Sequence, residues 1–183
     1  MNNTQNVSLE MMLSHGLAVI KNIKKSITVI DMPYKSYETK SQALHNALKL
    51  IKYTKADLIK LEIDHSKIDI LKYLVEKKVK VIAHIGVTPQ KYKNFKKIKV
   101  LGKSEIERKK LCDLAKTCET VGVQALLLEC IVERVAKIIT SSIRIPTIGI
   151  GSSKYCDGQI LVFDDLINLS NDKFKPKFVK TYL

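Results

Sequence analysis

Short apolar runs rich in β-branched residues alternate with amphipathic helical stretches along the whole chain. This alternation is typical of parallel strands joined by crossover helices, because a parallel strand needs a long connection back to the starting edge of the sheet. We therefore expect one α/β domain that spans residues 1–183. The expected strands are residues 27–31, 58–62, 79–84, 125–129, 146–151 and 159–163.

The helical stretches each show one apolar face. Apolar residues recur at helical spacing within residues 9–23 and again within residues 43–51. Ser104 and Glu107 form a capping-box pattern that predicts the start of a third helix, and Gly122 is placed to end it.

The number of strands limits the architecture. Six strands in 183 residues give about thirty residues for each βα unit, which is the usual size. A closed (β/α)8 barrel needs about 250 residues, so the chain has room for about six of the eight units. We therefore predict an incomplete TIM-type barrel. Because its first and last strands each lack a neighbour, we expect a chain that is marginally stable, oligomeric or prone to aggregate.

The composition narrows the class of protein. Hydrophobic residues make up 45% and charged residues 27% of the chain, which supplies a core and excludes disorder as the main state. No apolar run approaches the roughly 20 residues that cross a bilayer, and the first residues do not form a signal peptide, so we expect a cytoplasmic protein without membrane contact. The four cysteines lack the spacing of a metal site, and we expect reduced, mostly buried thiols.

The net charge of +14 comes from lysine, which accounts for 29 of the 32 basic residues. Half of the excess lies in the range Lys91–Lys110, which holds nine basic and two acidic residues. Such a run is typical of a solvated surface. A basic RNA-binding protein is an alternative, but arginine, which reads base edges with paired hydrogen bonds, is nearly absent. We therefore expect no nucleic-acid partner.

Ionisable side chains follow four of the expected strands at their carboxyl ends: Asp31, Glu62, His84 and Glu129. In parallel α/β folds this edge of the sheet carries the functional site. The alternation of side chains along a strand also places Lys60 on the same face as Glu62. A barrel lumen would therefore receive all five side chains together.

Three carboxylates in one site need compensation, because like charges and burial both oppose ionisation. Lys60 supplies a positive charge beside Glu62, and Mg²⁺, which prefers carboxylate oxygens, would supply more. A metal and a lysine can polarise a chelated 2-oxo acid, and a remaining carboxylate can then remove the proton next to its keto group. The residues thus indicate metal-assisted enolate chemistry without defining the substrate.

The order and spacing of several segments match one enzyme family. These segments are Asp31–Tyr34, Lys60–Glu62, His84–Gln90, Leu128–Cys130, Pro146–Gly151, Cys156–Val162 and Pro176–Lys180. The H-x-G-x-T-P-Q pattern of the third segment and the P-T-I-G-I-G pattern of the fifth are the most specific. From about Asn3 to its last residue, the chain resembles the ketopantoate hydroxymethyltransferase (3-methyl-2-oxobutanoate hydroxymethyltransferase) family.

The resemblance implies a barrel of the phosphoenolpyruvate/pyruvate type that forms a homo-oligomer, a decamer. It also implies transfer of a hydroxymethyl group from 5,10-methylenetetrahydrofolate to 3-methyl-2-oxobutanoate through a Mg²⁺-stabilised enolate, which gives 2-dehydropantoate for pantothenate and coenzyme A synthesis. By motif, Glu129 is the proton acceptor, Asp31, Lys60 and His84 bind the substrate, and Asp31 and Glu62 hold the metal. We expect Glu62 to act through a water molecule, because the neighbouring Lys60 competes for its oxygens.

The chain also departs from the family pattern. The family's Gly-Asp-Ser metal and substrate motif belongs upstream of residue 1, so we interpret the sequence as truncated at its N-terminus and at its C-terminus. Ile63, Asp64 and Ala83 stand at glycine positions of the family, and Ser152-Ser153 replaces Ala-Gly. An inactive remnant and a complementing fragment therefore stay open beside the active enzyme, and we expect the chain alone to bind Mg²⁺ weakly.

Overall fold

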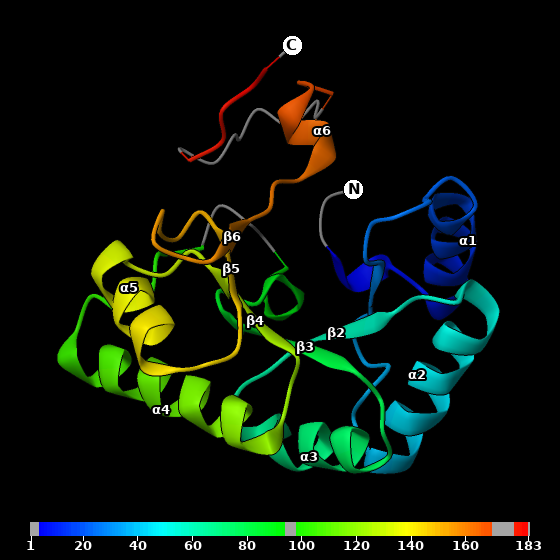
Figure 1. Ribbon diagram of the computed structural model, residues 1–183, viewed down its shortest axis with the longest axis horizontal. Coiled ribbons are helices and arrows are strands. Elements are labelled where there is room, and N and C mark those ends of the chain that lie inside the picture. Colours follow the sequence, from blue (N-terminus) through cyan, green and yellow to red (C-terminus); the bar gives the residue numbers. More distant parts are fainter. Residues whose placement is uncertain (1–3, 94–97, 170–177, 183) are drawn as a thin grey trace.

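The computed structural model describes residues 4–93, 98–169 and 178–182 (Figure 1). Residues 94–97 of the basic run and residues 176–177 of the last family segment lie outside the described residues. Within the described ranges, no helix is long and apolar enough to cross a membrane.

Six parallel strands form one sheet, and their order in space follows their order in the chain. They are β1 (Val29–Asp31), β2 (Leu58–Glu62), β3 (Val81–Gly86), β4 (Ala125–Glu129), β5 (Thr147–Ile150) and β6 (Gly158–Gln159). Helices α1 to α5 lie around one side of the strands in Figure 1, so the sheet curls as part of a barrel wall. The predicted parallel α/β class and the incomplete TIM-type barrel are confirmed.

Helices α2 to α5 connect successive strands from β1 to β5, whereas α1 precedes β1 and α6 follows β6. The helices are α1 (Leu9–Ile20), α2 (Lys40–Thr54), α3 (Ile68–Glu76), α4 (Glu105–Val121), α5 (Glu133–Ser142) and α6 (Phe163–Leu166), with short 3₁₀ turns η1 (Thr4–Asn6), η2 (His65–Lys67) and η3 (Pro89–Lys91). The predicted limits of α4 are confirmed. Ser104 and Glu107 form a reciprocal capping box, and Gly122 ends the helix in the left-handed conformation.

The two faces of the sheet bury different residues. Alternate side chains such as Ile59, Leu61 and Leu126 point outward and pack with the helices into the main core. The opposite positions of β3 and β4 form a small inner cluster of Ile82, Ala125 and Leu127. The apolar part of the inner face lies before the carboxyl ends of the strands. The carboxyl ends themselves carry polar side chains.

The prediction of a strand over residues 159–163 is wrong for most of that range. Strand β6 covers only Gly158–Gln159, and a single further hydrogen bond joins the N–H of Ile160 to the carbonyl of Gly149, 3.0 Å away. Its neighbour β5 ends at Ile150, so the later residues have no strand to pair with, and Phe163 begins α6 instead. The first strand is also shorter than expected and begins at Val29.

The four cysteines are free thiols, and all but the half-buried Cys112 are buried, as the sequence predicts. Burial raises the pKa of Cys118 to about 12. Burial, together with the neighbouring Glu129, raises the pKa of Cys130 to about 11. These two side chains are therefore unreactive thiols at neutral pH.

Candidate active site

Strand register brings the five predicted side chains together on the inner face, at the carboxyl ends of the strands. Asp31 aligns with Lys60 across β1 and β2, and Glu62 aligns with His84 across β2 and β3. Glu129 ends β4 beside the last residue of β3. Residues in register point to the same face of a sheet, so all five share the carboxyl end of the barrel wall.

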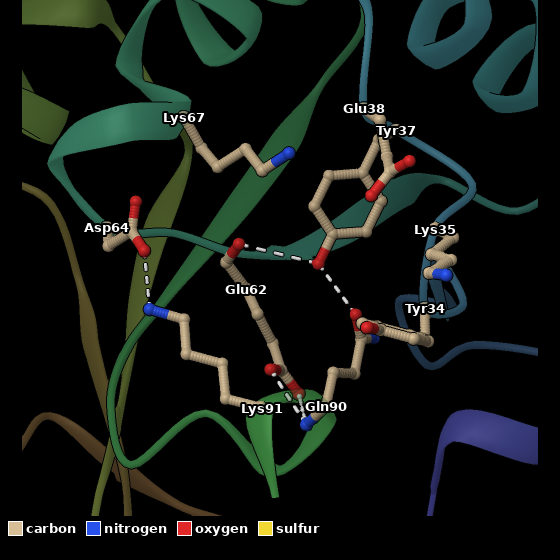
Figure 2. Close-up of a pocket in the computed structure, with 9 residues that line it drawn as sticks. All are labelled: Tyr34, Lys35, Tyr37, Glu38, Glu62, Asp64, Lys67, Gln90 and Lys91. Carbon is tan, nitrogen blue, oxygen red and sulfur yellow. Dashed lines mark hydrogen bonds and ion pairs between the residues drawn. The ribbon is translucent and has the colours of Figure 1, made fainter.

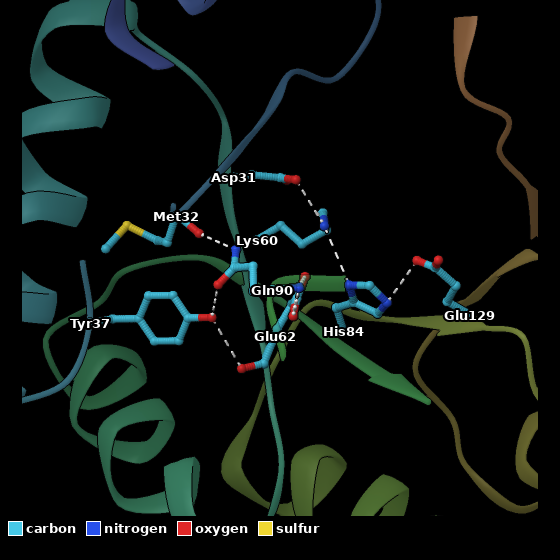
Figure 3. Close-up of polar contacts among 8 residues, drawn as sticks. All are labelled: Asp31, Met32, Tyr37, Lys60, Glu62, His84, Gln90 and Glu129. Atoms are coloured by element: carbon cyan, nitrogen blue, oxygen red, sulfur yellow. Dashed lines mark hydrogen bonds and ion pairs between the residues drawn. The ribbon is translucent and has the colours of Figure 1, made fainter. Parts of the chain in front are cut away.

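Four of these side chains form one continuous line of contacts (Figure 3). The Nζ atom of Lys60 lies 2.9 Å from Oδ2 of Asp31 and 3.5 Å from Nδ1 of His84. The Nε2 atom of His84 lies 3.2 Å from Oε2 of Glu129. The line therefore runs from β1 to β4 and ends at the carboxylate that the sequence predicts to be the proton acceptor.

His84 is a neutral link in this line. Burial lowers its pKa and the Lys60 ammonium lowers it further, against the opposing attraction of Glu129. An ammonium group can only donate, so Nδ1 accepts from Lys60 and the ring proton lies on Nε2, on the side of Glu129. No aligned hydrogen bond within the described part of the chain satisfies this Nε2. The N–H therefore acts on Glu129 through a close electrostatic contact.

Lys60 keeps its positive charge. Burial alone would lower its pKa, but attraction from the nearby carboxylates, Asp31 first among them, outweighs burial and raises it. We predicted that this charge lies beside Glu62 and competes for its oxygens. Lys60 does attract the Glu62 carboxylate, but its direct ion pair is with Asp31, because Lys60 and Asp31 align across β1 and β2.

The carboxylate of Glu62 accepts hydrogen bonds from the segment that follows β3. The backbone N–H of Gln90 donates to its two carboxylate oxygens at 3.0 and 3.2 Å. Burial raises the pKa of Glu62 to about 8, and the carboxylates of Glu129 and Asp31 act in the same direction. At neutral pH most of the Glu62 side chains are therefore protonated when no cation is bound.

Three residues without a predicted role complete the site. The Nε2 group of Gln90 donates to the carbonyl oxygen of Met32 at 2.8 Å, and its Oε1 accepts a hydrogen bond from the Tyr37 hydroxyl at 2.7 Å. The T-P-Q end of the His84–Gln90 motif was the available signal for Gln90. Met32 lies within the Asp31–Tyr34 segment, whereas Tyr37 carried no signal, because its contribution depends on a contact with a distant residue.

A pocket borders Glu62 and Gln90 (Figure 2). Its lining residues are Tyr34, Lys35, Tyr37, Glu38, Glu62, Asp64, Lys67, Gln90 and Lys91. Lys91 forms an ion pair with Asp64, and the Lys67 ammonium lies 5.7 Å from the centre of the Tyr37 ring. Glu62 can therefore be reached from this pocket as well as from the inner face.

The donor set fits a hard divalent cation. Among the described residues, no three His, Cys, Asp or Glu side chains converge closely enough to enclose an ion. Mg²⁺ needs only one or two protein carboxylates and takes its other oxygens from water and substrate, and Asp31 and Glu62 supply two. Burial is the main cause of the raised pKa of Glu62, and the nearby carboxylates of Glu129 and Asp31 add a smaller contribution that a cation would offset.

Several residues at which the sequence departs from the family pattern pack in the outer core or stabilise turns near the site. Ala83 and Ile63 are 0% and 1% exposed and pack in the outer core. Asp64 caps η2 through the N–H of Ser66. The Ser152 hydroxyl donates to the carbonyl of Leu128 at 2.9 Å, which ties the end of β4 to the turn after β5. The extra bulk of Ala83 and Ile63 therefore does not enter the inner face.

Replacing Glu62 by Gln should change how stability depends on pH. The folded pKa of about 8 lies above the ordinary value of 4.5, so the folded state binds the extra proton. This stabilisation is complete below about pH 4 and is lost as pH rises through 8. Between pH 5 and pH 9, the wild type should lose about 2–4 kcal/mol of unfolding free energy relative to Glu62→Gln.

Denaturant unfolding at several pH values in EDTA measures this difference. Glu38→Gln is the matched control, because Glu38 lines the same pocket and is exposed. Its stability should follow that of the wild type at every pH. Parallel pH profiles for Glu62→Gln and the wild type would contradict the protonated state of Glu62.

Comparison with known proteins identifies the family. Among solved structures, N-(5'-phosphoribosyl)anthranilate isomerase from Pyrococcus furiosus aligns with a TM-score of 0.49 and 14% identity, over 81% of this chain and 63% of that one. The family model of ketopantoate hydroxymethyltransferase matches residues 1–183. The 3-methyl-2-oxobutanoate hydroxymethyltransferases of Pelagibacter ubique and Clostridium botulinum (strain Loch Maree / Type A3) are each 46% identical, over 98% of this chain and over 68% and 66% of their own lengths. The chain thus spans about two thirds of these curated relatives and belongs to the ketopantoate hydroxymethyltransferase family.

Proposed function

We propose that this chain acts in the reaction for which its relatives are named. In that reaction the methylene carbon of 5,10-methylenetetrahydrofolate and the oxygen of a water molecule become a hydroxymethyl group on C3 of 3-methyl-2-oxobutanoate. The products are 2-dehydropantoate and tetrahydrofolate. The observation that carries the proposal is the line Asp31–Lys60–His84–Glu129, because it ends at a carboxylate whose second oxygen is left for a substrate proton.

The residues divide the chemistry between them. Glu129 accepts the proton from C3 of the 2-oxo acid, next to the keto group. His84 contacts Oε2 of Glu129 and so leaves Oε1 for that proton. Lys60 donates to the oxygens of the substrate and polarises its keto group. When bound, Mg²⁺ would be held by Asp31 and Glu62 and would act as a Lewis acid toward the keto oxygen.

We also propose the finer properties that the resemblance implies for this chain. These are a barrel of the phosphoenolpyruvate/pyruvate type, a cytoplasmic location, Mg²⁺ and methylenetetrahydrofolate as cofactor and cosubstrate, and a homo-oligomer, a decamer. Exposed apolar side chains support self-association: Ile27, just before β1, is 73% exposed, and Phe163, at the start of α6, is 65% exposed.

Proton exchange at C3 of 3-methyl-2-oxobutanoate tests the proposal without folate. In D₂O the chain with Mg²⁺ should accelerate the loss of the C3 proton signal about 100-fold over buffer. EDTA should abolish the effect, and 3-methylbutanoate, which lacks the keto group, should not exchange. Adding methylenetetrahydrofolate should then yield 2-dehydropantoate. An exchange rate equal to that of buffer with and without Mg²⁺ would overturn the proposal for this chain.

A further inference from the structure

Gln90 uses every polar group that it has. Its backbone N–H donates to the Glu62 carboxylate at 3.0 Å, and its carbonyl oxygen accepts from Nε2 of Gln5 at 2.8 Å. Its side-chain amide donates to the Met32 carbonyl at 2.8 Å and accepts from the Tyr37 hydroxyl at 2.7 Å. One residue thereby bonds to four residues in three segments: η1, the connection between β1 and α2, and the end of β2.

These bonds join the loops that follow three neighbouring strands (Figure 3). Met32 directly follows Asp31 at the end of β1, Glu62 ends β2, and Gln90 lies in η3 after β3. Gln90 thus bonds directly to Glu62 and to the residue that follows Asp31, and Glu62 and Asp31 carry the two carboxylates proposed to hold the cation. The proposed proton transfer and substrate binding assign no role to Gln90.

The amide group suits this position because it combines a donor and an acceptor at a fixed separation and stays neutral at every pH. The Tyr37 hydroxyl determines which way the amide faces. The hydroxyl donates to Oε1 of Gln90. The amide nitrogen is then left to donate to the Met32 carbonyl.

We infer that Gln90 is a positioning residue that sets the spacing of the Asp31 and Glu62 carboxylates for a divalent cation. The inference rests on the proposed function for the presence of the cation and on the hydrogen bonds above for the spacing. Groups that orient metal-binding side chains change metal affinity by about 10- to 100-fold when they are removed.

Hydrogen exchange tests, without any metal, whether the Gln90 side chain holds η3 against Glu62. In Gln90→Ala, the backbone N–H of residue 90 should exchange about tenfold faster in an NMR experiment, because the side chain no longer holds the loop against Glu62. Gln42→Ala is the matched control. The amide of Gln42 also bridges two backbone groups, those of Lys35 and Glu38, but Gln42 is exposed, in the first turn of α2. It should leave the exchange of residue 90 unchanged.

Metal affinity then tests whether Gln90 positions Asp31 and Glu62 for a cation. Mn²⁺ binding, followed by water-proton relaxation and by the Mn²⁺ EPR spectrum, should weaken about tenfold in both Gln90→Ala and Gln90→Glu. It should be unchanged in Gln42→Ala. Tyr37→Phe removes only one hydroxyl, so it provides a second variant with the same expected direction should Gln90→Ala fail to fold.

The outcomes separate this inference from the proposed function. If the wild type binds no Mn²⁺, the proposed metal site fails, and with it the inference that Gln90 serves a cation. If the wild type binds Mn²⁺ and the Gln90 and Tyr37 variants bind it equally well, only the inference about Gln90 fails. Exchange of residue 90 at the wild-type rate in Gln90→Ala would also overturn it.

Discussion

Glu129→Gln should lower the rate of C3 proton exchange by a factor of about 10²–10⁴ while leaving the protein folded. Glutamine has the same shape as glutamate, but its amide cannot take up a proton at neutral pH. The backbone position is retained in this variant, because it depends on strand register and on the bond from the Val87 N–H to the Glu129 carbonyl at 2.9 Å. The lost rate therefore reports the missing proton acceptor.

Glu133→Gln is the matched control for this experiment. Glu133 is an exposed glutamate four residues later, in the first turn of α5. Its exchange rate should stay within about twofold of the wild type, since surface substitutions rarely disturb a distant site. The role of Glu129 as proton acceptor is wrong if Glu129→Gln exchanges the proton as fast as Glu133→Gln does.

Gly86→Ala should be the most destabilising single substitution considered for this chain, at about 3 kcal/mol. Gly86 has φ +100°, and a Cβ atom built on it would lie 2.3 Å from the carbonyl oxygen of Glu129. Strands β3 and β4 would have to separate at their ends, which would break the bond between Val87 and Glu129. The same movement would displace the proposed proton acceptor, so the exchange rate should fall too.

Gly122→Ala separates steric clash from backbone strain. Gly122 has a similar φ of +96°, but its nearest neighbour to an added Cβ would be Cγ1 of Val75 at an ordinary 3.5 Å. Only strain remains, and a loss of about 1 kcal/mol is expected. In thermal unfolding the drop in Tm should be about three times larger for Gly86→Ala. Equal drops would show that the close approach at Gly86 does not constrain the strands.

Most of the fold could be predicted because its signals are local. Helix α4 follows from a capping box and a closing glycine within a few residues of its own ends. The central strands follow from short apolar runs. Strand β6 could not be predicted in the same way, because the residues after Gln159 are apolar enough for a strand and lack only a neighbour. Pairing is a property of two segments, and no single segment shows it.

The candidate site, too, could be predicted from the sequence only in part. The sequence by itself determined that Asp31, Lys60, Glu62, His84 and Glu129 share one face, because side chains alternate with a period of two and each residue ends or nearly ends a strand. It also contained the family motifs. Both the alternation and the motifs depend only on residue type and spacing, so both can be recognised from the sequence.

Only the tertiary structure decided how these residues interact. It pairs Lys60 with Asp31 rather than with Glu62, leaves His84 neutral, and raises the pKa of Glu62 through burial. It also brings in Gln90, whose partners lie up to 85 residues away in the chain. Protonation states and hydrogen-bond partners depend on burial and on distances between remote segments, and those quantities exist only once the sheet has curled and the loops have met above it.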